Sequence, residues 1–280
     1  MEKRSIKDFE HIYKDGYEFT MSEYFSSGWK LFEKSVGPMI GYGFIFIVIS
    51  SMASVVLGLI PIVGSIVNQV ASSVLIAGYS IYMGKKYLNR NAEFEDFFRG
   101  IRFITPIAFS LLFEFLVGLP IIIVAAVIFF SFFGLSSLNE FTDLQDPLFW
   151  KNLPIPDFTN LILPFILLFS ILIVYALSYL FVIKLIVNSG LQAWTAMEVS
   201  RRVVWKRFFH FLLFTFVLGL INIAGAMLIG IGLLFTLPLT TCIIHVAYEK
   251  IIRSTEQTVL SDKYDSFGED SATDFFEKEE

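Results

Sequence analysis

Long apolar stretches alternate with short polar blocks along this 280-residue chain. An α-helix needs roughly 20 mostly apolar residues to cross a bilayer, and about six of the stretches approach or exceed that length. We predict spans at residues 38–60, 65–84, 103–134, 161–183, 209–228 and 233–249. The pattern therefore predicts an all-α polytopic membrane protein whose six transmembrane helices form three hairpins.

A segment with the periodicity of an amphipathic helix precedes each hairpin. Apolar side chains recur at helical spacing in residues 20–35 (Phe25, Trp29, Phe32), 93–102 (Phe94, Phe97, Phe98, Ile101) and 194–208 (Trp194, Met197, Val204, Trp205, Phe208). Thr20 and Glu23 fit a capping box, with Thr20 as the N-cap. Amphipathic helices bury their apolar face at the headgroup boundary, so we predict three interfacial helices along the inner surface.

The basic residues predict the orientation of the chain. Of the 21 Lys and Arg, 20 lie in four blocks, at residues 1–36, 84–102, 184–207 and 250–280, and the exception is Lys151. Lys and Arg accumulate on the cytoplasmic side of membrane proteins. Both termini are therefore predicted to be cytoplasmic, and residues 136–160 form the largest outer loop.

The chain divides into three parts under this interpretation. Residues 1–19 are predicted to be a cytoplasmic tail, residues 20–253 the membrane domain, and residues 254–280 an acidic, disordered cytoplasmic tail. Residues 249–280 carry ten acids and four bases, which accounts for the net charge of −5. Because the bases follow membrane boundaries instead of one face, nucleic-acid binding is not expected.

Composition and motifs argue against a soluble fold and against an enzyme. Hydrophobic residues make up 55% of the chain and charged residues 17%, and a soluble core could hide one such segment but not six. The single cysteine, Cys242, permits no disulfide within one chain. No His-x-x-His pair, Gly-x-Ser-x-Gly elbow or phosphate-binding glycine loop occurs, so we predict no catalytic residues, no metal and no cofactor.

Polar residues inside the predicted spans form one candidate site. Glu114 is the acid placed well inside an apolar span, and such residues often mark function because burying a charge in a bilayer is costly. Others that could join it in a polar network are His245, Asn68, Gln69 and Asn222. Two alternatives stay open: ordinary hydrogen bonding between helices, and for Glu114 a position near the headgroups.

A basic cluster forms a second candidate site. Arg201, Arg202, Lys206 and Arg207 suit anionic lipid headgroups, which attract nearby bases by about 1 kcal/mol each. The alternative is that these four residues only set the orientation of the chain.

The order of several short motifs resembles a group of uncharacterised bacterial integral membrane proteins. These YciC-like proteins are related to the membrane domain beside some glycerophosphoryl diester phosphodiesterases. The similar segments are 22–32 (SEYFSSGWKLF), 60–64 (IPIVG), 97–100 (FFRG), 230–232 (GIG) and 236–238 (TLP), and the resemblance covers about residues 17–253. It implies a six-span protein of the bacterial inner membrane and carries over no catalytic residue.

Three functions compete at this stage. The favoured one is a non-enzymatic membrane protein that organises lipid or binds a partner, with membrane lipids, a second copy or another membrane protein as its partners. The alternative is a transporter for a small or lipidic solute that uses Glu114. The third, an intramembrane enzyme, lacks a second catalytic group other than His245.

Overall fold

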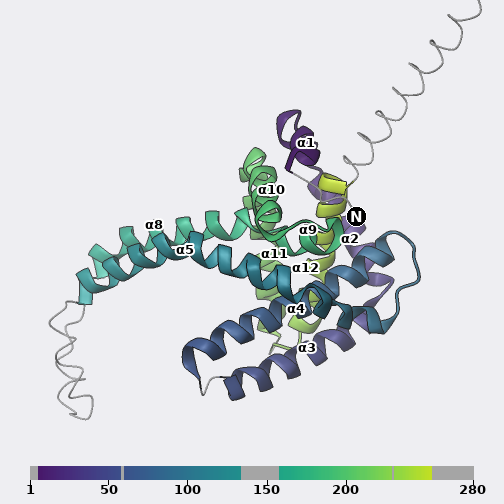
Figure 1. Cartoon of the computed structure of the whole chain (residues 1–280), viewed down its shortest axis with the longest axis horizontal. Helices are drawn as coiled ribbons and strands as arrows, with labels where there is room; N and C mark the ends of the chain where they lie inside the picture. The colour runs from purple at the N-terminus through teal and green to yellow at the C-terminus, as the bar shows by residue number, and fades with distance from the viewer. Residues whose placement is uncertain (1–5, 58–59, 134–157, 229, 254–280) are drawn as a thin grey trace, which may run out of the picture. The chain divides into compact units, whose positions relative to one another are not determined.

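The described part of the chain is helical throughout. A computed structural model describes residues 6–57, 60–133, 158–228 and 230–253, and these residues contain helices and no strand. They form two compact units (Figure 1). The larger unit lies within residues 1–110 and 179–280, and the smaller unit spans residues 111–178. The predicted acidic tail and most of the predicted outer loop lie outside the described residues.

Helices occupy the six stretches predicted as spans. They are α3 (Val36–Leu57), α4 (Pro61–Tyr87), α5 (Ile104–Phe133), α8 (Phe158–Ser178), α11 (Phe208–Met227) and α12 (Leu233–Tyr248). Five helical stretches are long and apolar enough to cross a membrane: Val36–Leu57, Val63–Tyr87, Phe94–Ile128, Ile162–Ser189 and Phe208–Met227. The prediction of an all-α fold is confirmed for the described residues, and these five stretches support the class of a multi-pass membrane protein.

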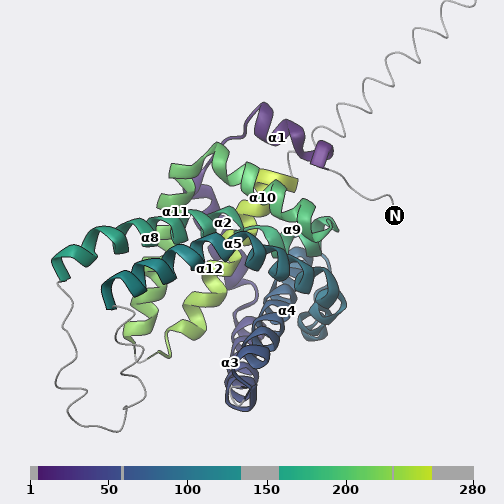
Figure 2. The same ribbon diagram turned by 60° about the vertical axis from the view of Figure 1, so that its left-hand side comes forward.

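Helix α12 differs from the other five. It has 16 residues, and at about 1.5 Å per residue it is shorter than a hydrocarbon core of about 30 Å. It is also largely enclosed, since Cys242, His245 and Val246 are fully buried. Helix α2 (Met21–Glu33) packs along it, and α11 lies beside it as α3 lies beside α4 (Figure 2). The helix therefore forms the centre of the larger unit.

The first amphipathic segment forms helix α2 where it was predicted, but its N-cap and its packing face differ from the prediction. Thr20 is the N-cap residue, yet its hydroxyl donates to the Glu23 carboxylate at 3.0 Å and caps no backbone N–H. The predicted capping box is therefore wrong. A Cβ on Gly28 would lie 2.6 Å from the Ile243 side chain, so α2 and α12 touch closely, whereas Trp29 is 54% exposed. The helix face that packs inward is Tyr24, Gly28, Leu31 and Phe32.

The second amphipathic segment is a 3-10 helix, η2 (Phe94–Phe103), instead of an α-helix. Phe97 is fully buried, with its ring stacked on Tyr82 at 4.1 Å and on Tyr42 at 4.4 Å. Phe97 therefore packs against both α3 and α4. Phe94 and Phe98 remain 41% and 45% exposed.

The backbones of α4 and η2 approach each other through two glycines. A Cβ on Gly78 would lie 1.8 Å from the Phe97 carbonyl oxygen, and one on Gly100 would lie 2.3 Å from the Val74 carbonyl oxygen. Real Cβ contacts are never this short, so only glycine is compatible with the observed separation. This close approach is what allows Phe97 to insert between the two tyrosine rings.

The third amphipathic segment forms α10 (Ala193–Lys206), which follows the short helix α9 (Val182–Ser189). Trp194 and Trp205, assigned to its apolar face, are 55% and 54% exposed. Met197 and Val204, assigned to the same face, are buried, together with smaller side chains such as Ala196, Val199 and Val203. The N-terminal segment, η1 (Ile6–Phe9) and α1 (Glu10–Lys14), packs on this helix.

The described part of the smaller unit consists of α8 and the part of α5 beyond Ser110, which run side by side (Figures 1 and 2). The Tyr175 hydroxyl donates to the backbone carbonyl of Glu114 at 2.6 Å. A Cβ on Gly118 would lie 3.4 Å from the same hydroxyl oxygen. A tyrosine of one helix therefore binds the backbone of the other, where the small Gly118 leaves room for the ring.

Candidate anion-binding pocket

The predicted polar network within the spans is dispersed. The Asn68 amide donates to Ser54 at 3.2 Å between α4 and α3, and the Asn222 amide donates to Thr240 at 3.4 Å between α11 and α12. Gln69 is exposed. Among the described residues, no hydrogen bond joins any two of the five predicted site residues. The two asparagines thus each link the paired helices of one hairpin.

Glu114 belongs to the smaller unit, whereas the other four predicted residues belong to the larger one. It is half-buried, and its carboxylate has no hydrogen bond or ion pair with any described residue. The polar contact at this position is the one from Tyr175 to the backbone. Neither unit by itself assembles the predicted site around Glu114.

His245 is the first of three titratable side chains that are spaced four residues apart along α12 and η4 (Glu249–Arg253), a single π-helical turn. Its imidazole is fully buried, and its Nε2 lies 3.5 Å from the Glu249 carboxylate. Glu249 in turn pairs with Arg253 at 3.2 Å. Lys184 is buried in α9, because α9 packs against both α4 and α10.

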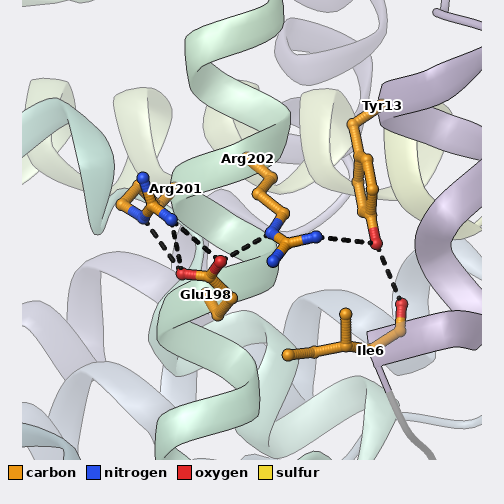
Figure 3. Close-up of polar contacts among 5 residues, drawn as sticks. All are labelled: Ile6, Tyr13, Glu198, Arg201 and Arg202. Carbon is orange, nitrogen blue, oxygen red and sulfur yellow. Dashed lines mark hydrogen bonds and ion pairs between the residues drawn. The ribbon is translucent and has the colours of Figure 1, made fainter.

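The predicted lipid-binding cluster holds the N-terminal segment onto α10. Arg201 and Arg202 bind the Glu198 carboxylate at 2.8 and 2.6 Å, and the Arg202 guanidinium also donates to the Tyr13 hydroxyl at 3.4 Å (Figure 3). Lys206 and Arg207 donate to backbone carbonyls of the segment, those of Lys14 and Tyr17. Lipid binding by these four bases stays a prediction.

The pKa of Glu198 is consistent with a role in holding the N-terminal segment on α10. Burial works to raise the pKa of this carboxyl, but the hydrogen bonds from Arg201 and Arg202 outweigh it and hold the pKa below its usual range. The carboxylate therefore stabilises the docked segment above the pKa of an unfolded Glu, about 4.3. That contribution is lost as the pH falls through the lower pKa of the folded state.

The larger unit contains a pocket of about 310 Å³ whose lining is rich in basic side chains. Five of its lining side chains are basic, and no acidic side chain lines it. The remainder are mostly apolar. The lining residues are Ile81, Gly84, Lys85, Leu88, Arg90, Arg99, Arg102, Phe103, Val187, Asn188 and Arg253.

The C-terminal turn of α4 supplies two of the bases. The N–H of Arg90 donates to the Lys85 carbonyl at 2.9 Å, and the N–H of Asn89 donates to the Lys86 carbonyl at 3.1 Å. Asn89 itself has a φ of 52°. This is a Schellman-type ending, with an asparagine in the left-handed position. The turn therefore folds Arg90 back to the same end of α4 as Lys85.

A buried carboxylate positions two bases of the pocket. Asp96 is fully buried, and it binds Lys85 at 2.7 Å and Arg99 at 2.9 Å. Its other oxygen accepts the backbone N–H of Glu93 at 2.9 Å, which completes a capping box at the start of η2. The Asp96 side chain thus caps the start of η2 and links η2 to α4.

The two remaining bases, Arg102 and Arg253, come from two different elements, and α9 adds an amide. Arg102 extends from the last turn of η2, and Arg253 extends from the π-helical turn after α12. Asn188 of α9 lines the same pocket, where its amide donates to Ser80 at 3.1 Å. Single π-helical turns are frequent at functional sites. Basic residues far apart in the sequence therefore converge on one pocket.

The pocket carries an excess of positive charge. Asp96 is shared by Lys85 and Arg99, and Glu249 pairs with Arg253. In the described part of the chain, Arg90 and Arg102 have no ion-pair partner. Five bases against two carboxylates leave three positive charges uncompensated. The arrangement is suited to binding an anion, because arginine forks match phosphate oxygens.

The sequence pattern did not single out this pocket. Its bases belong to the blocks that predict orientation, and nothing in their spacing distinguishes Arg90 or Arg102 from Lys86. No group of three His, Cys, Asp or Glu suited to a metal ion occurs among the described residues. Comparison of the chain with protein-family models, curated proteins and solved structures finds no match.

Proposed function

We propose that this chain is a non-enzymatic, multi-pass membrane protein that binds the phosphate group of anionic lipids in the basic pocket. The observation that carries the proposal is the convergence of five bases, with no acid in the lining, at one end of a helical membrane protein. Basic pockets between membrane helices are known to hold anionic headgroups. The apolar lining residues Ile81, Leu88, Phe103 and Val187 suit the glycerol and the first carbons of the chains.

The proposal includes α12 as a sixth span and places both termini in the cytoplasm. The four basic blocks support this orientation because they touch one another within the larger unit. Lys250 of the fourth block pairs with Glu23 of the first, Arg202 of the third contacts Tyr13 of the first, and Arg253 joins the bases of the second in the pocket. We infer the bacterial inner membrane from the resemblance of residues 17–253 alone.

Cysteine labelling in intact cells tests this orientation. The native Cys242 is buried, so single cysteines are introduced into a Cys242→Ala background. Cysteines at Ser22, Asn89 and Ser261 are expected to resist a membrane-impermeant thiol reagent, whereas one at Thr142 is expected to react. Reaction at Asn89 together with protection at Thr142 would reverse the orientation and place the pocket on the outer side.

Lipid titration tests the binding proposal itself. The purified protein is titrated with phosphatidylglycerol and with phosphatidylcholine, and bound lipid is counted by native mass spectrometry. We expect tighter binding of phosphatidylglycerol than of phosphatidylcholine. We expect Arg102→Gln to weaken phosphatidylglycerol binding by about fivefold, because a base near a membrane surface contributes roughly 1 kcal/mol.

The matched control for this titration is Lys30→Gln, which removes an exposed base outside the pocket. It should leave the affinity unchanged. Equal affinity for the two lipids, or an equal effect of the two variants, would contradict the proposed site. The alternative of a transporter that uses Glu114 receives no support from this pocket, since Glu114 is not among its lining residues.

A further inference from the structure

We propose that the pocket selects a lipid headgroup carrying two phosphate groups over one carrying a single phosphate. This inference rests on the proposed function and names the class of ligand for the same site. The first ground is charge. Three positive charges remain after Asp96 and Glu249 are paired, whereas a single phosphodiester brings one negative charge. A ligand with two phosphates compensates more of the excess.

The two carboxylates near the pocket are committed to the fold and cannot supply that compensation. Both oxygens of Asp96 are engaged, one by Lys85 and Arg99 and the other by the backbone N–H of Glu93. Glu249 lies between Arg253 and the buried His245. Like charges held in one pocket repel one another, so the remaining bases favour a polyvalent anion.

The second ground is how the bases are distributed. The five bases come from different elements: Lys85 and Arg90 from α4 and the turn after it, Arg99 and Arg102 from η2, and Arg253 from the turn after α12. A volume of about 310 Å³ lies within the range of about 300–1,000 Å³ that is usual for small-molecule sites. It therefore offers room for more than one phosphate, and its lining holds four arginines whose forks match phosphate oxygens.

The third ground decides between a lipid and a soluble diphosphate, which share the same chemistry. Four of the lining side chains are apolar: Ile81, Leu88, Phe103 and Val187. A free diphosphate has no apolar part to place against them. A lipid headgroup does, because its glycerol and chain carbons follow the phosphates. Pyrophosphate is therefore the probe that separates the two sources.

The experiment compares three probes on the full chain in a neutral detergent: diphosphatidylglycerol, phosphatidylglycerol and pyrophosphate. The variant is Arg90→Gln with Arg102→Gln, which removes two bases that have no described carboxylate partner and so leaves no acid unpaired. The matched control is Lys30→Gln with Lys34→Gln, two exposed bases outside the pocket. Affinities come from native mass spectrometry, with melting temperatures recorded to verify folding.

We expect the wild-type chain to bind diphosphatidylglycerol at least tenfold more tightly than phosphatidylglycerol at equal phosphate concentration. We expect the double variant to lose that preference, and the control to keep it. If the wild-type chain binds the two lipids with equal affinity, and the double variant binds both more weakly, the two-phosphate inference is overturned while the proposed lipid site stands. Pyrophosphate binding as tight as that of the lipid would overturn the lipid assignment. No difference between variant and control would overturn both.

Discussion

Gly78→Ala is expected to separate α4 from η2 and to lower the melting temperature of the purified protein sharply. The new methyl carbon would lie 1.8 Å from the Phe97 carbonyl oxygen and 2.8 Å from the Tyr42 hydroxyl. The first of these atoms is backbone, so the strain is relieved only if the two elements move apart. Overpacking of this kind costs about 1–3 kcal/mol, occasionally more. Here we expect the upper end of that range, because separation also opens the stack around Phe97.

The control for this substitution is Gly219→Ala in α11, where a Cβ meets nothing within 4 Å. Alanine is favoured over glycine in a helix by up to about 1 kcal/mol, so this variant should be neutral or slightly more stable. Melting is followed by intrinsic tryptophan fluorescence in detergent. Equal melting temperatures for the two variants would mean that the close approach of α4 and η2 does not exist in solution.

Asp96→Ala is expected to destabilise the protein while strengthening its response to anionic lipid. The substitution removes a fully buried carboxylate together with its bonds to Lys85, Arg99 and the Glu93 N–H. A cap is worth about 1 kcal/mol and hydrogen bonds to charged groups about 1.5–3 kcal/mol. We therefore expect a loss of about 3 kcal/mol, because both bases remain partly exposed and can turn to water.

The response of the melting temperature to added lipid separates an effect of Asp96 on the charge of the pocket from an effect on stability alone. Without Asp96 the pocket gains one uncompensated charge, so added phosphatidylglycerol should raise the melting temperature of Asp96→Ala more than that of the wild type. Asp96→Asn should fall between the two, since it keeps an acceptor for the Glu93 N–H. Glu95→Ala, an exposed neighbour on the same helix, is the control. A destabilised Asp96→Ala that responds to lipid no more than the wild type would argue against the pocket as the lipid site.

The amino-acid sequence by itself determined where the six long apolar helices are. Apolar stretches of near-bilayer length contain few charges, so hydrophobicity alone locates α3, α4, α5, α8, α11 and α12 to within a few residues. It also located the polar blocks between them. Both are local properties of a stretch of chain, so they can be predicted without knowing which residues pack against that stretch.

The faces of the amphipathic segments were decided by the tertiary structure. Of the residues that periodicity placed on the apolar side, Phe32, Met197 and Val204 are buried within the protein. Trp29, Trp194 and Trp205 are more than half exposed, as residues at a lipid boundary would be. On α2, Tyr24, Leu31 and Phe32 pack inward on either side of Gly28, where α12 approaches too closely for a side chain. Hydrophobicity ranks side chains by their affinity for an apolar environment, but it does not tell where a helix touches the backbone of a neighbour.

The candidate site also depended on the tertiary structure. Glu114 stood out in the sequence because one acid in a long apolar stretch is conspicuous, but the described contact there is a backbone hydrogen bond from Tyr175. The pocket bases are unremarkable in the sequence, where Arg90 and Arg253 lie 163 residues apart. Only the Schellman turn after α4, the buried Asp96 and the π-helical turn after α12 bring them together. Convergence of charge is a property of the fold, because it depends on distances between residues that are remote along the chain.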